Sequence, residues 1–219
     1  MFTWNILTTF AGKFVKTMTV PAIPMTIDVL SSYLNGFKAP MQKILDMEQK
    51  GELVRLKRGL YITANGNPNL FLVANHLYGP SYVSCESALR YYGLIPEHVE
   101  SVISVSTLRS KEFENALGRF SYRHIPIDYY PLDICIQTEK EVSFQIASPE
   151  KALADLVILT SGIRLRYKKE ILEYLEQDLR LDMEAFYKMD AAVFEHIATV
   201  SKKSKALLNI AKILRNDNI

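Results

Sequence analysis

Cysteine is scarce in this 219-residue chain, and its scarcity excludes several kinds of protein. Cys85 and Cys135 are the only two. They have neither the spacing of a metal-binding motif nor the dense pattern of a disulfide framework. We therefore expect two free thiols, as in proteins of a reducing cytoplasm, although the sequence leaves a buried pair open.

Long apolar runs are also missing. No segment approaches the roughly 18 residues that a membrane span requires. The chain begins Met1-Phe2-Thr3-Trp4 and its first basic residue is Lys13, so its start lacks the positive region of a secretory signal. We expect a cytoplasmic protein with no membrane partner.

The motifs of the common catalytic classes are absent as well. The sequence contains no glycine-rich phosphate loop, no dinucleotide fingerprint, no H-E-x-x-H and no G-x-S-x-G. Ser148-Pro149-Glu150-Lys151 matches S-x-x-K formally, but Ser148 fits a helix N-cap and Pro149 the first helical position. The four histidines are scattered and form no pair with metal-ligand spacing; they are His76, His98, His124 and His196. We expect no enzyme activity, no cofactor and no metal site.

What is present is an apolar, folded composition with an uneven distribution of charge. Hydrophobic residues make up 48% of the chain, which excludes a disordered protein. Residues 1–75 carry a balance of +4, residues 76–145 a balance of −3 and residues 146–219 a balance of +1. A basic N-terminal third favours an anionic partner, although ordinary fluctuation of a few charges would give the same numbers.

Two short helices are predicted between residues 26 and 51. Thr26 can cap a helix through Leu34, with Ile27, Leu30 and Leu34 on its inner face, and Asn35-Gly36 should end it with a left-handed glycine. Pro40 should begin a second helix, which runs to about Lys50 and ends at Gly51. The inner side of this second helix is assigned to Met41, Ile44, Leu45 and Glu48. The two helices and their tight turn have the layout of a helix-turn-helix.

A basic hairpin follows this helix pair. Residues 52–56 and 60–63 alternate like strands, and Lys57-Arg58-Gly59 forms the turn between them. A helix-turn-helix followed at once by a hairpin predicts a winged helix, whose second helix enters the major groove while the hairpin tip lies along a phosphate backbone. The alternative is a winged helix that binds proteins, with a basic tip that is only solvated.

The winged-helix interpretation assigns individual DNA contacts. Lys57 and Arg58 should contact phosphate from the tip. Three further candidates lie outside the apolar stripe of the second helix, and they are Lys38, Gln42 and Lys43. Asp46 lies outside this stripe as well. We assign Lys38 to the phosphate backbone and Gln42 to base recognition, because its amide can pair with adenine.

The rest of the chain is predicted to be α+β. An amphipathic helix is indicated by Phe2, Ile6, Phe10 and Phe14. The turn-rich residues 65–69 mark a boundary between a winged-helix DNA-binding domain (1–68) and a larger domain (69–219) with an α/β middle and a helical C-terminal region. The predicted strands are 102–105, 120–125, 134–138 and 142–146. The predicted helices begin near residues 69, 84, 148, 167, 182 and 191, and a final helix carries Ala206, Leu207, Ile210, Ala211 and Leu214.

Basic residues recur at the C-terminal end. Between Ile197 and Asn216 there is no acidic residue. The five basic ones are Lys202, Lys203, Lys205, Lys212 and Arg215. They form a candidate second surface for nucleic acid or for an acidic partner, and the solvated face of a terminal helix is the alternative.

Three stretches together resemble the AbiEi-type antitoxin and transcriptional regulator family of bacterial abortive-infection systems. The first is Lys57-Arg58-Gly59-Leu60-Tyr61 after the helix pair. The second, residues 82–96, resembles the central motif of the family, with Tyr92 where that motif often has histidine. The third is residues 147–156, and beyond about residue 165 no family motif is matched.

The resemblance implies a two-part protein. Its winged helix would bind double-stranded operator DNA at an inverted repeat and repress its own operon, and its larger part would counter a nucleotidyltransferase-like toxin, with or without a stable contact. The alternatives are a protein-interaction module, a general transcriptional regulator without antitoxin activity, and an enzyme with a nuclease-like middle. The enzyme lacks support from any carboxylate or histidine constellation.

Overall fold

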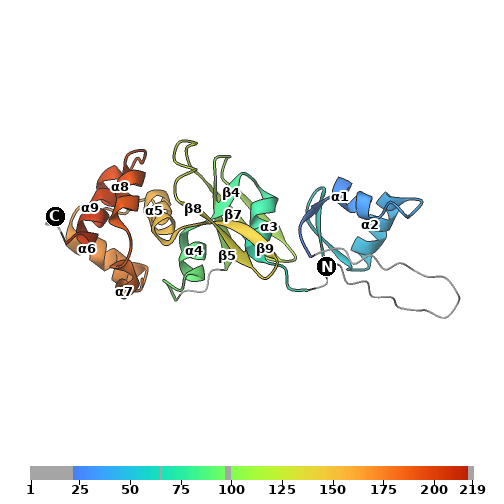
Figure 1. The fold of residues 1–219 in the computed structure, drawn as a ribbon, viewed down its shortest axis with the longest axis horizontal. Helices are drawn as coiled ribbons and strands as arrows, with labels where there is room; N and C mark the ends of the chain where they lie inside the picture. The colour runs from blue at the N-terminus through green and yellow to red at the C-terminus, as the bar shows by residue number, and fades with distance from the viewer. Residues whose placement is uncertain (1–21, 65, 97–99, 217–219) are drawn as a thin grey trace. The chain divides into compact units, whose positions relative to one another are not determined.

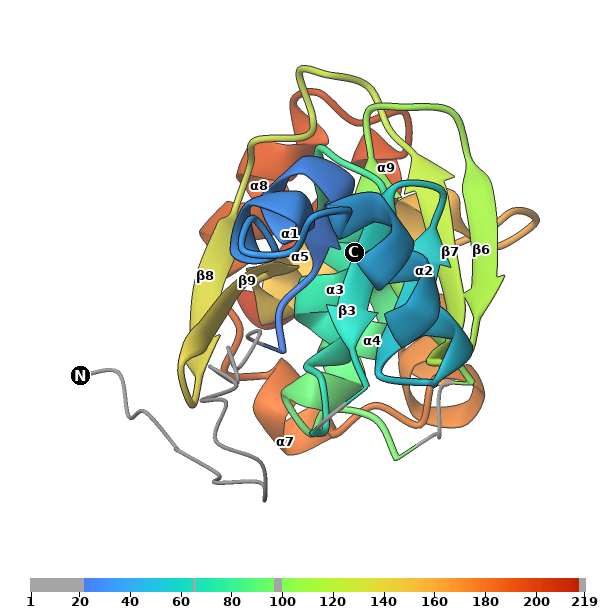
Figure 2. The ribbon, with the colours of Figure 1, turned by 90° about the vertical axis from the view of Figure 1, so that its right-hand side faces the viewer.

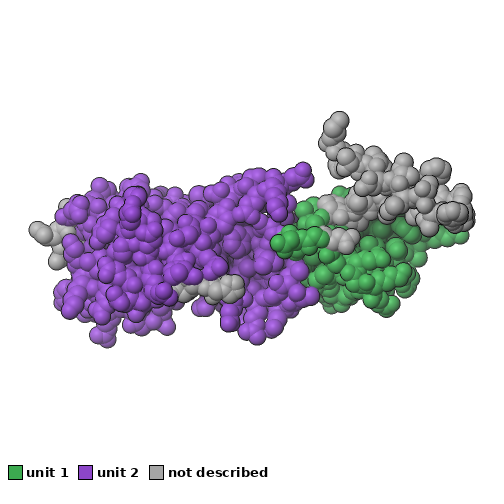
Figure 3. Space-filling model, turned by 90° about the horizontal axis from the view of Figure 1, so that it is seen from below, with its two compact units in different colours: residues 1–68 green, residues 69–219 purple. Residues whose placement is uncertain are grey.

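The computed structural model describes residues 22–64, 66–96 and 100–216, and within them the chain has an α+β fold. It divides into two compact units, unit 1 (Met1–Pro68) and unit 2 (Asn69–Ile219), which Figure 3 distinguishes by colour. The helix predicted around Phe2 to Phe14 lies outside the described residues. None of the helices in the described ranges has the length and hydropathy of a membrane span.

Unit 1 combines two helices with a three-stranded antiparallel sheet. Its elements are β1 (Met25–Thr26), α1 (Ile27–Tyr33), α2 (Pro40–Gln49), β2 (Leu53–Lys57) and β3 (Leu60–Thr63), and the strand order is β1-β3-β2 (Figure 1). Both helices and the sheet contribute to one core, which contains Met25, Leu30, Leu34, Ile44, Leu53 and Tyr61. The predicted helices and hairpin are therefore present at nearly the predicted bounds.

Local signals in the sequence explain these bounds. The Thr26 side chain accepts a hydrogen bond from the Val29 N–H at the start of α1, and Pro40 occupies the first turn of α2. Gly51 follows α2 at φ 70° and Gly59 forms the hairpin turn at φ 78°, a left-handed region that disfavours side chains. Capping residues, proline and glycine thus determine where these helices and strands begin and end.

Three details of the prediction for unit 1 are wrong. Gly36 is not left-handed, because α1 ends at Leu34, whose N–H donates to the carbonyls of Leu30 and Ser31. Lys38 precedes α2 instead of lying on it. Met41 and Leu45 are 52% and 41% exposed, since Ile44 and the partly buried Met47 form the inner side.

Unit 2 is built on a six-stranded mixed sheet of order β6-β7-β5-β4-β9-β8, with β6 and β8 at its two edges (Figure 2). The strands are β4 (Ser81–Val83), β5 (Ser101–Ser106), β6 (Lys111–Asn115), β7 (Gly118–His124), β8 (Ile134–Glu139) and β9 (Val142–Ala147). Strand β5 runs parallel to β7, β4 runs parallel to β9, and the other pairs are antiparallel. The predicted hairpin of β8 and β9 is confirmed, whereas β6 was not predicted.

Helices cover the two faces of this sheet. Helix α3 (Leu70–Leu77) packs on the face that carries Phe144 and Tyr122, and the Tyr122 hydroxyl donates to the Ala74 carbonyl. Helices α4 (Cys85–Tyr91) and α5 (Pro149–Leu159) pack on the opposite face near β5 and β9 (Figure 1). Among the described residues, no helix covers the β6–β7 end of that second face.

The helical C-terminal region packs on α5. Its elements are α6 (Lys168–Glu173), the π-helical turn η1 (Tyr174–Asp178), α7 (Met183–Phe186), α8 (Ala191–Ala198) and α9 (Ser204–Leu214). The predicted Ser148 cap is confirmed, because its hydroxyl accepts from the Lys151 N–H at 3.0 Å. Ser84 lies at the N-cap position of α4, but its hydroxyl donates to the Asp155 carboxylate and makes no cap hydrogen bond.

Candidate nucleic-acid interface

The basic hairpin tip of unit 1 is fixed to the helix pair. Arg58 is exposed and Lys57 is partly exposed at the end of β2. The Ile27 N–H donates to the Gly59 carbonyl at 3.0 Å, so the turn is tied to the start of α1. The backbone of the tip therefore lies beside the start of α1.

A second contact joins the hairpin to α2. The Arg55 guanidinium of β2 lies 2.9 Å from the Glu48 carboxylate of α2, and it stacks 5.6 Å from the centre of the Tyr61 ring. Tyr61 and Glu48 both raise the pKa of Arg55, in that order of size. The helix that we expect in the groove and the hairpin that we expect on the backbone are therefore cross-linked by side chains.

The outward side of α2 carries the predicted base reader. Gln42 is exposed, and its Nε2 donates to the Asp46 carboxylate at 3.1 Å. The Lys43 ammonium lies 5.4 Å over the ring of Phe37, which is itself 49% exposed. Lys38 is exposed in the segment between the helices. The structure thus brings all five predicted DNA contacts into unit 1, on the hairpin, on α2 and just before it.

The predicted basic C-terminal surface is only partly available to a partner. Lys203 donates to the carbonyls of Val157 and Thr160, which end α5, and its partial burial lowers the pKa of its ammonium. Arg215 binds Glu195 through two nitrogens, at 2.7 and 3.0 Å. These two cations hold the helical region together.

A second basic segment lies beside α9. The Asn209 side chain donates to the carbonyls of Leu165 and Arg166, at 3.2 and 2.9 Å. Asn209 shares a face of α9 with the exposed Lys205 and Lys212, because these positions are three or four residues apart. The exposed Arg164 and Arg166 thereby join the remaining members of the predicted surface, which sequence spacing alone did not indicate.

Sequence reasoning missed a fully buried polar cluster in unit 2, which we call the Asp155 cluster and which contains Tyr82, Ser84, Tyr129, Lys151 and Asp155. Asp155 Oδ2 accepts from the Tyr82 hydroxyl at 2.9 Å and from the Ser84 hydroxyl at 2.6 Å. Its other oxygen accepts from the Tyr129 hydroxyl and lies 3.4 Å from the Lys151 ammonium. The Lys151 and Asp155 side chains are both 0% exposed.

Every charged or hydroxyl group in the Asp155 cluster has a partner. The Lys151 ammonium also donates to the Tyr129 carbonyl at 3.2 Å, and it lies 3.2 Å from the centre of the Tyr129 ring. Burial lowers the pKa of Lys151, an effect that Asp155 opposes, and burial raises the pKa of Tyr129. With its partners all internal, the cluster joins β4, the segment before β8 and α5, and it acts as an internal clamp.

One signal in the sequence pointed to this cluster. Lys151 and Asp155 are four residues apart in a helix that is otherwise Ala, Leu and Val at its centre. Opposite charges at this spacing on an apolar helix indicate a buried pair. Their partners Tyr82 and Ser84 lie about 70 residues earlier, a separation that no local pattern bridges.

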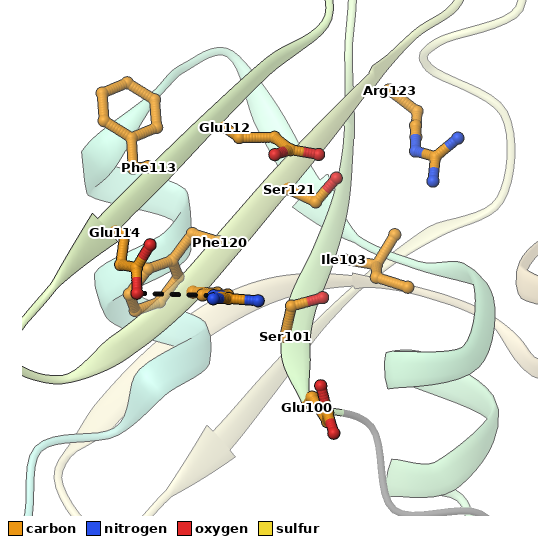
Figure 4. A pocket seen from close by; sticks show the side chains of 10 residues that line it. Glu100, Ser101, Ile103, Glu112, Phe113, Glu114, Phe120, Ser121 and Arg123 are labelled. Carbon is orange, nitrogen blue, oxygen red and sulfur yellow. Dashed lines mark ion pairs between the residues drawn. The ribbon is translucent and has the colours of Figure 1, made fainter.

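A groove of about 610 Å³ lies on the uncovered end of the sheet in unit 2. Figure 4 shows Glu112, Ser121 and Arg123 pointing to the same side of β6 and β7, and Arg119 pairs with Glu114 at 3.4 Å. Cys85 lines a smaller neighbouring cavity of about 280 Å³, and burial raises the pKa of its thiol well above the ordinary value. Such a thiol is a poor nucleophile. Side chains of both charges line the larger groove.

The described residues contain no group of three His, Cys, Asp or Glu side chains that could hold a metal ion. In comparisons with known proteins, no family model and no curated protein matches the chain.

Proposed function

We propose that this chain is a DNA-binding antitoxin that represses its own operon, with unit 1 acting as a winged helix. The observation that carries the proposal is the cross-linked pair of α2 and the basic hairpin. The exposed side of α2 and the cations Lys57 and Arg58 belong to elements that share one core, and the Arg55–Glu48 pair joins the hairpin to α2. A helix and a basic tip placed together match the major-groove and phosphate contacts of helix-turn-helix proteins.

The strand order supports the winged-helix assignment. β1 precedes the two helices and pairs with β3, the second strand of the following hairpin, which places β3 in the middle of the sheet. The turn between β2 and β3 lies at the end of the sheet where Thr26 of β1 pairs with Leu60 of β3. Double-stranded DNA is the partner that accepts a helix in its groove and a basic loop on its backbone together.

We assign the antitoxin role to unit 2 on the strength of the family resemblance. Two of the three stretches that carry the resemblance meet in the Asp155 cluster, since Tyr82 and Ser84 come from residues 82–96 and Lys151 and Asp155 from residues 147–156. Shared contacts between them support treating both stretches as the signature of one fold. The partner in this role is a nucleotidyltransferase-like toxin.

DNA binding is tested by titrating the full chain against duplex DNA from upstream of its own gene. Replacing Lys57 and Arg58 by Ala should weaken binding to all sequences alike and reduce the slope of log K against log salt by up to about 2. The matched control replaces Lys140, which lies at the exposed tip of the β8–β9 hairpin, by Ala and should leave binding unchanged. Unchanged affinity of the Lys57/Arg58 variant would overturn the docking geometry.

Base recognition is tested separately. Gln42→Ala should cost about 1–3 kcal/mol at one base pair of the site and leave binding to unrelated DNA unchanged. Binding to site variants at each position measures this loss. Equal losses on specific and unrelated DNA would contradict a base contact.

The antitoxin role is tested by coexpression with the toxin gene that neighbours this gene. The Lys57/Arg58 double variant should lose repression of a reporter and still restore growth in the presence of the toxin. Loss of growth rescue in this variant, at normal protein level, would contradict the division of roles between the units.

A second candidate function is a protein-interaction module. The exposed side chains of Phe37, Met41 and Leu45 favour it, because clusters of exposed apolar residues often mark contact surfaces. A gel shift with upstream DNA distinguishes the two functions, since an interaction module would leave the DNA unshifted.

A further inference from the structure

The outward side of α2 has an unusual composition for a surface that faces DNA. We call it the α2 outer face and define it by Met41, Gln42, Leu45 and Gln49, all exposed. These positions form one stripe on the helix, opposite Ile44 and Met47. The face therefore offers two apolar side chains and two amides, and the Asp46 carboxylate borders it through its contact with Gln42.

None of the four residues of this face is basic. Lys43 is the single basic residue of α2, and its ammonium lies 5.4 Å from the centre of the Phe37 ring. Lys38 and Lys50 flank the helix before its start and after its end. Guanine is recognised mainly by Arg or Lys at its two major-groove acceptors, so the α2 outer face lacks the usual reader of guanine.

Gln42 is oriented for adenine. A carboxylate can only accept hydrogen bonds, so the contact with Asp46 requires the amide nitrogen of Gln42 on that side. The amide oxygen and the second N–H of Gln42 remain for a base edge. One acceptor beside one donor is the pattern that pairs with N6 and N7 of adenine.

Met41 and Leu45 complement thymine. Its C5-methyl group is the single apolar feature that an unmodified base pair presents in the major groove. With 52% and 41% of their surfaces exposed, both side chains have apolar area that a methyl group can cover. We propose, building on the DNA-binding function above, that the α2 outer face selects A·T pairs, with Gln42 on adenine and with Met41 and Leu45 on thymine methyl groups.

The test begins with the full chain and a library of duplex DNA with a random core. Selection should yield half-sites with a run of A·T pairs. The selected duplex is then made with deoxyuridine in place of thymidine in the half-sites, a change that removes the methyl groups and keeps base pairing. Affinity should fall about four-fold for each methyl group that Met41 or Leu45 covers. Deoxyuridine placed only outside the half-sites is the control probe and should have no effect.

Variants connect this loss to the two side chains. Met41→Ala with Leu45→Ala should bind thymidine and deoxyuridine duplexes equally, and retain the salt dependence of the unaltered chain. The matched control is Ile136→Ala, which truncates an apolar side chain that is 71% exposed on β8 of unit 2. It should keep the full preference for thymidine.

The outcomes separate this inference from the proposed function. Salt-dependent selection of a site, with equal affinity for thymidine and deoxyuridine duplexes, overturns the inference and leaves DNA binding in place. Half-sites rich in G·C pairs overturn it as well. Failure to bind any duplex overturns both proposals. If the Met41/Leu45 variant keeps its preference for thymidine and loses self-association, the apolar side chains serve a protein contact and the inference is wrong.

Discussion

Removing the charge of Asp155 should destabilise unit 2 far more than removing an equally spaced surface charge. Asp155→Asn keeps the shape of the side chain but leaves the Lys151 ammonium buried without a counter-ion. It also turns an amide N–H₂ toward groups that now donate to the carboxylate, among them the Tyr82 and Ser84 hydroxyls. Breaking a buried ion pair by removing one partner costs about 3–5 kcal/mol.

That cost is a large share of the stability of a domain. Folded domains are stable by about 5–15 kcal/mol, and in a domain of this size 1 kcal/mol lowers Tm by about 2–4 °C. Asp155→Asn should therefore lower the Tm of unit 2 by roughly 6–20 °C, a range that follows from the two preceding ones. Thermal denaturation followed by circular dichroism measures this shift.

The chain provides a matched control for this substitution. Glu184 and Lys188 have the same four-residue spacing and lie 2.7 Å apart, but their side chains are 82% and 70% exposed. Glu184→Gln should change stability by no more than ~0.5 kcal/mol, because water screens exposed pairs. If Asp155→Asn costs under about 1 kcal/mol, the claim that the Asp155 cluster holds α5 to β4 is refuted.

A rescue variant separates the charge from the packing. Replacing Lys151 by Met and Asp155 by Leu together removes both buried charges and keeps much of the volume. This double variant should recover part of the stability that Asp155→Asn loses, because well-packed apolar groups often replace a buried ion pair without cost. A double variant that is less stable than Asp155→Asn would show that the hydroxyl partners dominate.

Three further predictions concern stability. Burial raises the pKa of Tyr174 to about 12, so the stability that its neutral hydroxyl contributes is complete below pH 10 and is lost as pH rises toward 12. The free energy of unfolding, measured by urea denaturation above pH 10, should therefore fall less steeply with pH in Tyr174→Phe than in the unaltered chain. Equal slopes would contradict this. Gly59→Ala should lower the free energy of unfolding by about 1 kcal/mol because the φ of Gly59 is 78°. Gly36→Ala should not destabilise the protein, since Gly36 is not left-handed and has open space around it. Equal chemical-denaturation midpoints for the two variants would refute the difference. Lys203→Met should cost about 1–2 kcal/mol by freeing the carbonyls that end α5, and hydrogen exchange should then increase at that end.

Features with a local chemical signature were predictable from the sequence. Thr26, Pro40 and Ser148 mark helix starts because each satisfies or removes a free N–H of the first turn. The β8–β9 hairpin followed from alternation on both sides of a charged turn. Such signals involve only a few neighbouring residues, so they can be recognised from the amino-acid sequence alone.

Features that depend on distant partners were not predictable. The phase of α2 was misjudged by about one residue position, because Met41 and Leu45 fit an apolar stripe as well as Ile44 and Met47 do. Ser84 has the composition of an N-cap, yet the Asp155 carboxylate competes for its hydroxyl more strongly than the backbone of α4 does. In both cases tertiary contacts decide among local options that the sequence leaves nearly equal.

The edge strand β6 shows what a charged, unpredicted strand contributes. Lys111, Glu112 and Glu114 are exposed along it, in a run too polar to signal a strand. A second molecule that added a strand at this edge would have to remove water from these charges while its own backbone paired with β6. Strand addition at this edge is therefore disfavoured, so the same residues that hide β6 in the sequence protect the sheet from growing into a larger aggregate.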